Sequence, residues 1–182
     1  MAADNPDHAQ ANEPDPRRGP AAPSAAANAG WAAYALRAWL AAAEPSLLYF
    51  LARVAAGAAT LRPPARALEP AFAAYSLLAA PLLETALMLP LAYLLASMVP
   101  RRVRIQIVLL AAIGALAHYF GGGWRQVFAT LWPFLVYATT LITWLPRSGR
   151  GAFLLTAFVH ALYNATFFGV GALGAFLAGR GD

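Results

Sequence analysis

Four polar side chains lie in long apolar segments of this 182-residue chain, and their types and spacing suit acid–base chemistry. Glu84 is the only acidic residue in the four most apolar segments, and His118 follows later in the sequence GALAH. His160 and Asn164 lie four residues apart in HALYN, so they share one face of a helix. A carboxylate and imidazoles can move protons, and imidazole and carboxamide N–H groups can stabilise a developing negative charge.

The cost of placing such groups in lipid favours a functional site. An ionisable residue at the centre of a membrane span costs about 2.5–3.5 kcal/mol on insertion scales. A hydrogen bond between membrane helices returns about 0.6 kcal/mol on average, so purely structural bonding scarcely covers this cost. A structural role in holding the helices together remains the alternative.

The composition predicts that a membrane bundle positions these residues. Of all residues, 60% are hydrophobic and 12% are charged, about half the charged fraction of a soluble domain. We predict an all-α, polytopic transmembrane helical bundle, because the period-2 alternation of membrane strands is absent. The four predicted spans cover residues 71–99, 103–120, 125–145 and 151–178.

The N-terminal part of the chain differs from the bundle. Residues 1–29 are rich in Ala, Pro and Asp and predict a disordered polar tail. Residues 30–182 then form a single transmembrane domain. Between Trp31 and Leu61 we predict an interfacial helix followed by a short span beginning near Ser46, with Glu44 and Pro45 at its N-terminus.

Charge and cysteine content exclude several classes. The chain has no cysteine, which excludes disulfides, thiolate zinc sites, iron–sulfur ligation and a cysteine nucleophile. The net charge of +5 comes from arginines in short clusters between apolar segments, which is typical of topology anchors and predicts no nucleic-acid partner. If the segment after Ser46 also crosses, the positive-inside rule predicts a cytoplasmic N-terminus, in the plasma membrane of a prokaryote whose Ala- and Arg-rich composition indicates a GC-rich genome. One side of the bundle carries Arg101, Arg102, Arg104, Arg147 and Arg150, and the other carries Arg62, Arg66, Arg125 and Arg180.

Prolines predict a broken helix beside Glu84. Pro81 and Pro90 remove helical donors and free the carbonyls of Leu77 and Ala86. Broken helices at membrane depth are tolerated where they are buried in protein or line a cavity.

The order Glu84, His118 and His160-x-x-x-Asn164 resembles the CPBP family of glutamate-dependent intramembrane proteases. This family includes the CAAX prenyl protease 2 type and abortive-infection and bacteriocin-immunity relatives. The resemblance covers about residues 79–170. It departs from the family pattern Glu-Glu-x-x-x-Arg, because Thr85 stands where the second Glu would be and Leu89 where the Arg would be.

The resemblance implies an endopeptidase in which Glu84 and His118 activate a water molecule, while His160 and Asn164 form an oxyanion hole. It implies no cofactor, and its partners are the lipid bilayer and a peptide or membrane-protein substrate. Zinc held by Glu84, His118 and His160 is the mechanistic alternative. The alternative functions are a catalytically inactive binding or immunity protein of the same fold and, less favoured, a proton-coupled carrier.

The predicted spans leave one geometric requirement open. His118 falls near a helix end, whereas Glu84 and His160 fall near the middle of theirs. Their convergence requires a tilted or longer second helix, or a cavity that opens to one side.

Overall fold

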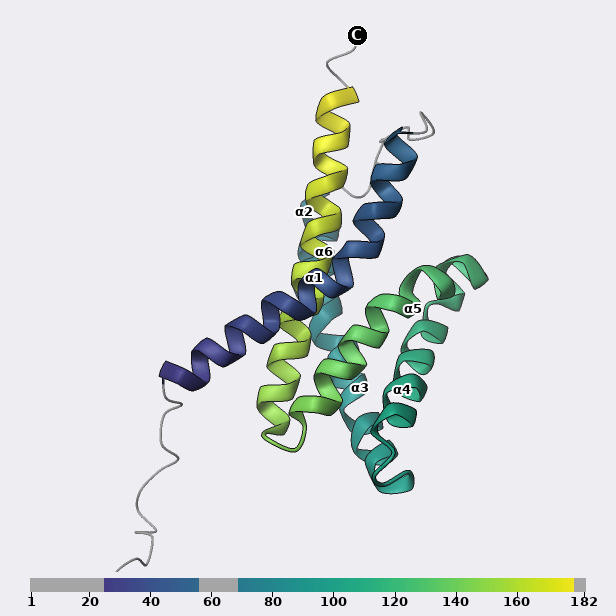
Figure 1. The fold of residues 1–182 in the computed structure, drawn as a ribbon. Coiled ribbons are helices and arrows are strands. Elements are labelled where there is room, and N and C mark those ends of the chain that lie inside the picture. The colour runs from purple at the N-terminus through teal and green to yellow at the C-terminus, as the bar shows by residue number, and fades with distance from the viewer. Residues whose placement is uncertain (1–24, 56–68, 179–182) are drawn as a thin grey trace, which may run out of the picture.

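The computed structural model describes residues 25–55 and 69–178, and in these ranges it contains helices and short turns but no strand (Figure 1). The predicted all-α class is confirmed for this part of the chain. The predicted tail lies outside the described residues up to residue 24, whereas residues 25–29 already belong to the first helix. The elements are α1 (Ala25–Ala55), α2 (Pro70–Ala74), the π-helical segment η3 (Tyr75–Ala79), α3 (Ala80–Met98), α4 (Val103–Ala117), α5 (Tyr119–Trp144) and α6 (Gly149–Ala178).

Three helical segments are long and apolar enough to cross a membrane, namely Pro70–Met98, Tyr119–Trp144 and Gly149–Ala172. They correspond to the first, third and fourth predicted spans. The second prediction, residues 103–120, is too long, because α4 has only 15 residues. Its length of about 22 Å is less than a hydrocarbon layer of about 30 Å.

The sequence after α4 explains why this helix stops. The His118 N–H donates to the Ala115 carbonyl at 3.1 Å, which tightens the last turn. The backbone then leaves helical geometry at Gly122 and Gly123, and Gly123 has a φ of 62° that glycine adopts without a Cβ penalty. This glycine-containing break therefore separates α4 from the main part of α5.

The N-terminal region forms one bent helix instead of two helices. Helix α1 continues through Glu44 and Pro45, so these residues do not begin a second helix as predicted. Figure 1 shows that α1 bends near its middle, and Pro45, the only proline inside it, removes a helical donor there. Of the predicted short span at residues 46–61, the part after Ala55 lies outside the described residues.

Small side chains and two tryptophans attach α1 to the rest of the bundle. Ala35, Ala38 and Ala42 form a buried stripe at helical spacing, which lets neighbouring helices approach closely. The Trp39 indole N–H donates to Thr166 Oγ1 at 2.9 Å, and the Trp132 indole N–H donates to the Ala41 carbonyl at 2.8 Å. These bonds connect α1 to both α5 and α6.

The remaining helices form two antiparallel hairpins, α3–α4 and α5–α6, whose turns lie at the same end of the bundle (Figure 1). Arg101 lies in the first turn with a φ of 64°, and Arg147 follows Trp144 in the second. The Arg147 guanidinium lies 4.9 Å from the Trp144 ring centroid. Five arginines therefore lie at this end, as the sequence predicts, and Arg125 lies near the α4–α5 connection.

The core lies between α3, α4, α5 and α6, and the alanine stripe of α1 packs into it. Its fully buried members from α3–α6 include Ala92, Leu110, Leu141, Leu155 and Val159. Close packing fixes the rotation of each helix, because each apolar stripe must face the others. That rotation in turn determines which polar side chains meet inside the bundle.

Candidate active site

Hairpin register brings Glu84 and His118 together. Glu84 lies about four turns before the end of α3, and His118 lies about four turns after the start of α4. Because α3 and α4 run antiparallel from one short turn, residues at equal distances from that turn lie side by side. The Glu84 Oε1 and His118 Nε2 atoms are 3.8 Å apart.

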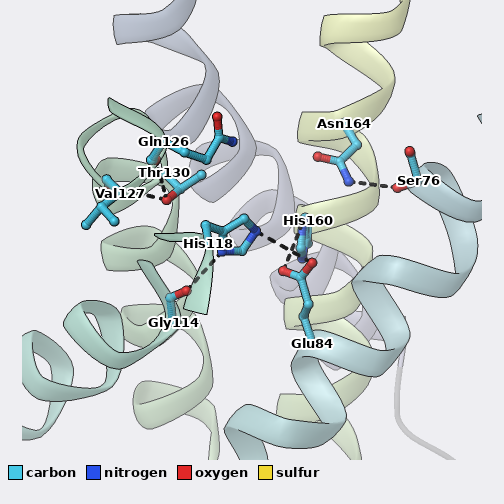
Figure 2. A network of polar contacts seen from close by, with 9 residues as sticks. All are labelled: Ser76, Glu84, Gly114, His118, Gln126, Val127, Thr130, His160 and Asn164. Atoms are coloured by element: carbon cyan, nitrogen blue, oxygen red, sulfur yellow. Dashed lines mark hydrogen bonds and ion pairs between the residues drawn. The ribbon is translucent and has the colours of Figure 1, made fainter. Parts of the chain in front are cut away.

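The last helix contributes the second imidazole. His160 lies on α6, with Nε2 3.8 Å from Glu84 Oε2, so each carboxylate oxygen faces one histidine (Figure 2). Both distances exceed the direct hydrogen-bond range, yet they are short enough for one water molecule to contact both groups. Helices α3, α4 and α6 thus meet at one cluster, although His118 lies at the very end of α4. We call Glu84, His118 and His160 the triad.

A backbone contact orients the His118 ring. His118 Nδ1 lies 3.0 Å from the carbonyl oxygen of Gly114, one helical turn earlier. Since a carbonyl only accepts, Nδ1 carries a proton, and a neutral ring presents its Nε2 lone pair to Glu84. This lone pair and the Glu84 carboxylate are both proton acceptors, so the two groups can share one added proton.

Aromatic side chains of α5 fix both imidazoles. The Tyr137 ring stacks on His160 with a centroid distance of 4.5 Å and an interplanar angle of 23°. The Phe134 ring makes edge contacts with His118 at 5.2 Å and with His160 at 6.3 Å. Gly114 has no side chain to separate α4 from Phe134, and a Cβ there would collide with that ring.

The Asn164 side chain contacts the broken helix. Its amide donates to the Ser76 carbonyl at 2.7 Å, and Figure 2 shows the side chain directed toward η3 and away from Glu84. The structure therefore places Asn164 on the face of α6 that carries His160, but in contact with the broken helix.

The π-helical turn explains why Ser76 accepts this bond. The Ala80 N–H donates to the Tyr75 carbonyl, as in a π-helix, and is directed away from the α-helical acceptor Ser76. The next possible donor is residue 81, a proline without an N–H. Ser76 is thus the free carbonyl in this turn, one residue before the predicted Leu77, and the Asn164 amide satisfies it.

The two sides of the triad differ in exposure. The Glu84 and His118 side chains are 29% and 27% exposed, whereas His160 is 9% exposed. Glu84 Oε2 itself is buried and has no hydrogen-bond partner among the described residues. A carboxylate that is partly accessible and not tied to structural donors is available to a ligand or water molecule.

The two departures from the family pattern are core residues. Thr85 is 1% exposed, and its hydroxyl has no partner within the described ranges. Leu89 packs against the hydrophobic core. Thr85 is therefore fully buried, and Leu89 is partly buried against the core.

Sequence reasoning did not find Ser76, Gly114, Phe134 or Tyr137. The signal for Gly114 is its spacing of four residues before His118, which places its carbonyl under the ring. No comparable signal marks the aromatic residues, since phenylalanine and tyrosine are common throughout apolar helices. In the described part of the chain, no group of three His, Cys, Asp or Glu side chains has a metal-site arrangement.

Comparison with known proteins adds no further information about the site. Neither a protein-family model, nor a curated protein, nor a solved structure matches this chain.

Proposed function

We propose that the protein is an intramembrane endopeptidase of the glutamate-dependent type that its motifs resemble. The observation that carries this proposal is the convergence of the triad. Glu84 presents one oxygen to His118 and the other to His160 at 3.8 Å each, from three different helices of an apolar bundle. An unbound, partly exposed carboxylate between two imidazoles is the arrangement that water activation needs.

In the proposed reaction, water attacks the carbonyl carbon of a substrate peptide bond while Glu84, assisted by His118, accepts its proton. The carbonyl oxygen becomes an oxyanion, and His160 stabilises it together with Asn164. When the C–N bond breaks, Glu84 returns the proton to the leaving amine. No covalent enzyme intermediate forms, and the proton count is unchanged after one cycle.

Asn164 can take part in this reaction without losing its structural contact. A carboxamide NH₂ group carries two N–H bonds, and one of them is directed to the Ser76 carbonyl. The second N–H serves the oxyanion. The Ser76 contact then holds the donor in place before the substrate binds, which is what an oxyanion hole requires.

The positions of Thr85 and Leu89 favour one second candidate, a non-catalytic binding or immunity protein of the same fold. Their side chains remove the supporting ion pair of the family without leaving a buried charge unpaired. The triad remains complete beside them, which supports catalysis over binding alone. A proton-coupled carrier is less supported, because the sequence shows no internal repeat with paired broken helices.

We further propose that the arginine-bearing end faces the cytoplasm, together with the N-terminus, in a prokaryotic plasma membrane. This orientation follows from the five arginines near the two hairpin turns and the positive-inside rule. The substrate is then a peptide segment that reaches the triad from the bilayer or its boundary.

The test is cleavage of a peptide library by the purified full-length chain in lipid nanodiscs. Mass spectrometry identifies new termini, and cleavage in H₂¹⁸O incorporates ¹⁸O into the new carboxylate. Glu84→Gln should lower the rate about a hundredfold or more, because general-base catalysis contributes about 10²–10⁴-fold. Glu69→Gln is the matched control, since Glu69 is exposed at the start of α2.

Three outcomes separate the candidates. Cleavage that Glu84→Gln abolishes and a chelator leaves unchanged supports the metal-free peptidase. Cleavage that a chelator abolishes and Zn²⁺ restores favours the zinc alternative at the same three residues. Equal cleavage by wild type and Glu84→Gln, or none by either, contradicts the peptidase and leaves the binding protein.

A further inference from the structure

We infer that the tip of the α4–α5 hairpin rests at a membrane–water boundary and that the bilayer is locally thin there, so that water reaches the triad from this edge. The proposed partner is the interfacial zone of a phospholipid bilayer. We call Tyr119, Phe120, Trp124 and Phe128 the tip cluster. The inference is independent of the proposed reaction.

The tip cluster has the composition of an interfacial anchor. Its side chains are 42% (Tyr119), 94% (Phe120), 59% (Trp124) and 70% (Phe128) exposed. Tyr119 contacts both Phe120 and Trp124, with centroid distances of 5.9 and 5.4 Å. Trp124 in turn contacts Phe128 at 6.3 Å. Tyrosine and tryptophan gather at the level of lipid headgroups, where one edge of the ring is wet and the other apolar.

Polar groups beside the cluster indicate the same boundary. Arg125 and Gln126 are exposed directly after Trp124. The backbone at Gly122 and Gly123 is not helical, and irregular backbone that faces lipid does not occur within hydrocarbon. A boundary at the tip cluster lets water solvate this backbone and the Arg125 guanidinium.

The length of α4 then determines the local thickness of the membrane. At its other end, Arg101, Arg102 and Arg104 mark the opposite boundary. The 15 residues of α4, which lie between Arg102 and His118, span about 22 Å, or less if the helix is tilted. A typical hydrocarbon layer is about 30 Å thick, so the bilayer must thin beside α4.

The helical segments beside α4 extend farther past the triad than α4 does. The α2–η3–α3 segment continues from Glu84 back to Pro70, about 20 Å beyond the triad, and α6 continues past His160 to Ala178. Figure 1 shows α6 extending well past the α4–α5 tip. Helix α4 is thus shorter than the helical segments beside it. The triad lies at the tip end of α4, because His118 immediately precedes Tyr119.

The test uses single spin-labelled cysteines in the full-length chain, which has no cysteine of its own. Phe120→Cys reports on the tip, and Leu109→Cys, 40% exposed near the middle of α4, is the matched lipid-facing control. Leu78→Cys, 65% exposed on η3, lies about 9 Å beyond Glu84 along the long helix. Labels are read in phosphatidylcholine–phosphatidylglycerol vesicles by collision with oxygen, which concentrates in lipid, and with a water-soluble nickel chelate.

We expect the nickel chelate to reach Phe120→Cys and to leave Leu109→Cys and Leu78→Cys in an oxygen-rich environment. A Phe120→Cys label as protected as Leu109→Cys would overturn the boundary at the tip. A Leu78→Cys label as accessible as Phe120→Cys would overturn local thinning, because water would then reach the long helix as readily as it reaches the tip. All three positions are exposed, so the labels do not disturb the core, and circular dichroism checks the helix content of each variant.

Discussion

The two histidines of the triad have the same chemistry but lie in two different environments. His160 lies inside the bundle, stacked on Tyr137, with 9% of its side chain exposed. His118 caps the end of a short helix, with 27% exposed and one nitrogen held by the Gly114 carbonyl. The difference shows how packing separates two chemically identical groups. Under the proposed function, the packed side would hold a donor rigidly, whereas the open side would exchange protons and ligands.

Removal of the Tyr137 ring should have the largest effect, on the packed side of the triad, which contains His160. Tyr137→Ala deletes a fully buried ring that contacts His160 and Phe134, and should lower the free energy of unfolding by about 3–5 kcal/mol. Tyr137→Phe should change it by less than about 1 kcal/mol, since the hydroxyl has no partner among the described residues. Reversible unfolding in mixed micelles measures both, and equal losses would show that the hydroxyl, and not the ring, is essential.

The contact between the two sides is tested at Gly114. Gly114→Ala should displace Phe134 and cost about 1–3 kcal/mol by overpacking, with a loss of activity because both imidazoles contact that ring. Gly169→Ala is the matched control in α6, where an added Cβ meets nothing within 4 Å. Thermal unfolding and the peptide assay are the measurements. An unaffected Gly114→Ala variant would contradict the role of Phe134 in positioning.

The link from α6 to the broken helix is tested at Asn164. Asn164→Asp replaces the amide donor by a carboxylate that faces the Ser76 carbonyl, and should cost about 1–3 kcal/mol. Asn164→Ala leaves the Ser76 carbonyl unsatisfied but introduces no charge, so its loss of stability should be smaller. If both variants unfold like wild type but lose kcat, Asn164 acts only on the oxyanion.

The smallest effect is a difference in chemical reactivity between the two imidazoles. His8 is the third histidine of the chain, and His8→Ala removes its reaction from the measurement. In this background, diethyl pyrocarbonate should modify His118 several-fold faster than His160, because His118 is the more exposed ring. Peptide mass spectrometry of timed samples measures both rates in one molecule. Equal rates would show that the two sides of the triad open together.

The sequence predicted the short list of polar residues because lipid penalises each of them. In the described helices, an isolated Glu84 and two histidines are visible against apolar neighbours without any structural information. The break beside Pro81 was also visible. The π-turn was not, because a proline shows that a helical donor is missing but does not show which carbonyl the neighbouring N–H groups will choose. For the same reason, the sequence marked Asn164 as polar but not its bond to Ser76.

Errors in the predicted helix boundaries had local causes. Apolar residues continue after Ala117, so hydropathy extended the second span to residue 120, whereas a tight turn at His118 ends the helix. The dipeptide Glu44-Pro45 is typical of a helix start, yet the buried alanines of α1 and the bonds of Trp39 and Trp132 hold one bent helix against the bundle. Tertiary packing overrode the local signal in that case.

The amino-acid sequence by itself determined an all-helical, strongly apolar chain with arginines at the turns and a few ionisable groups, because composition alone sets the cost of burying each residue. Only the tertiary structure decided that Glu84, His118 and His160 meet, that Tyr137 and Phe134 hold the rings, and that one side of the triad is open. These features depend on hairpin register and helix rotation. Both are set by contacts between residues far apart in the chain, which spacing along the sequence does not encode.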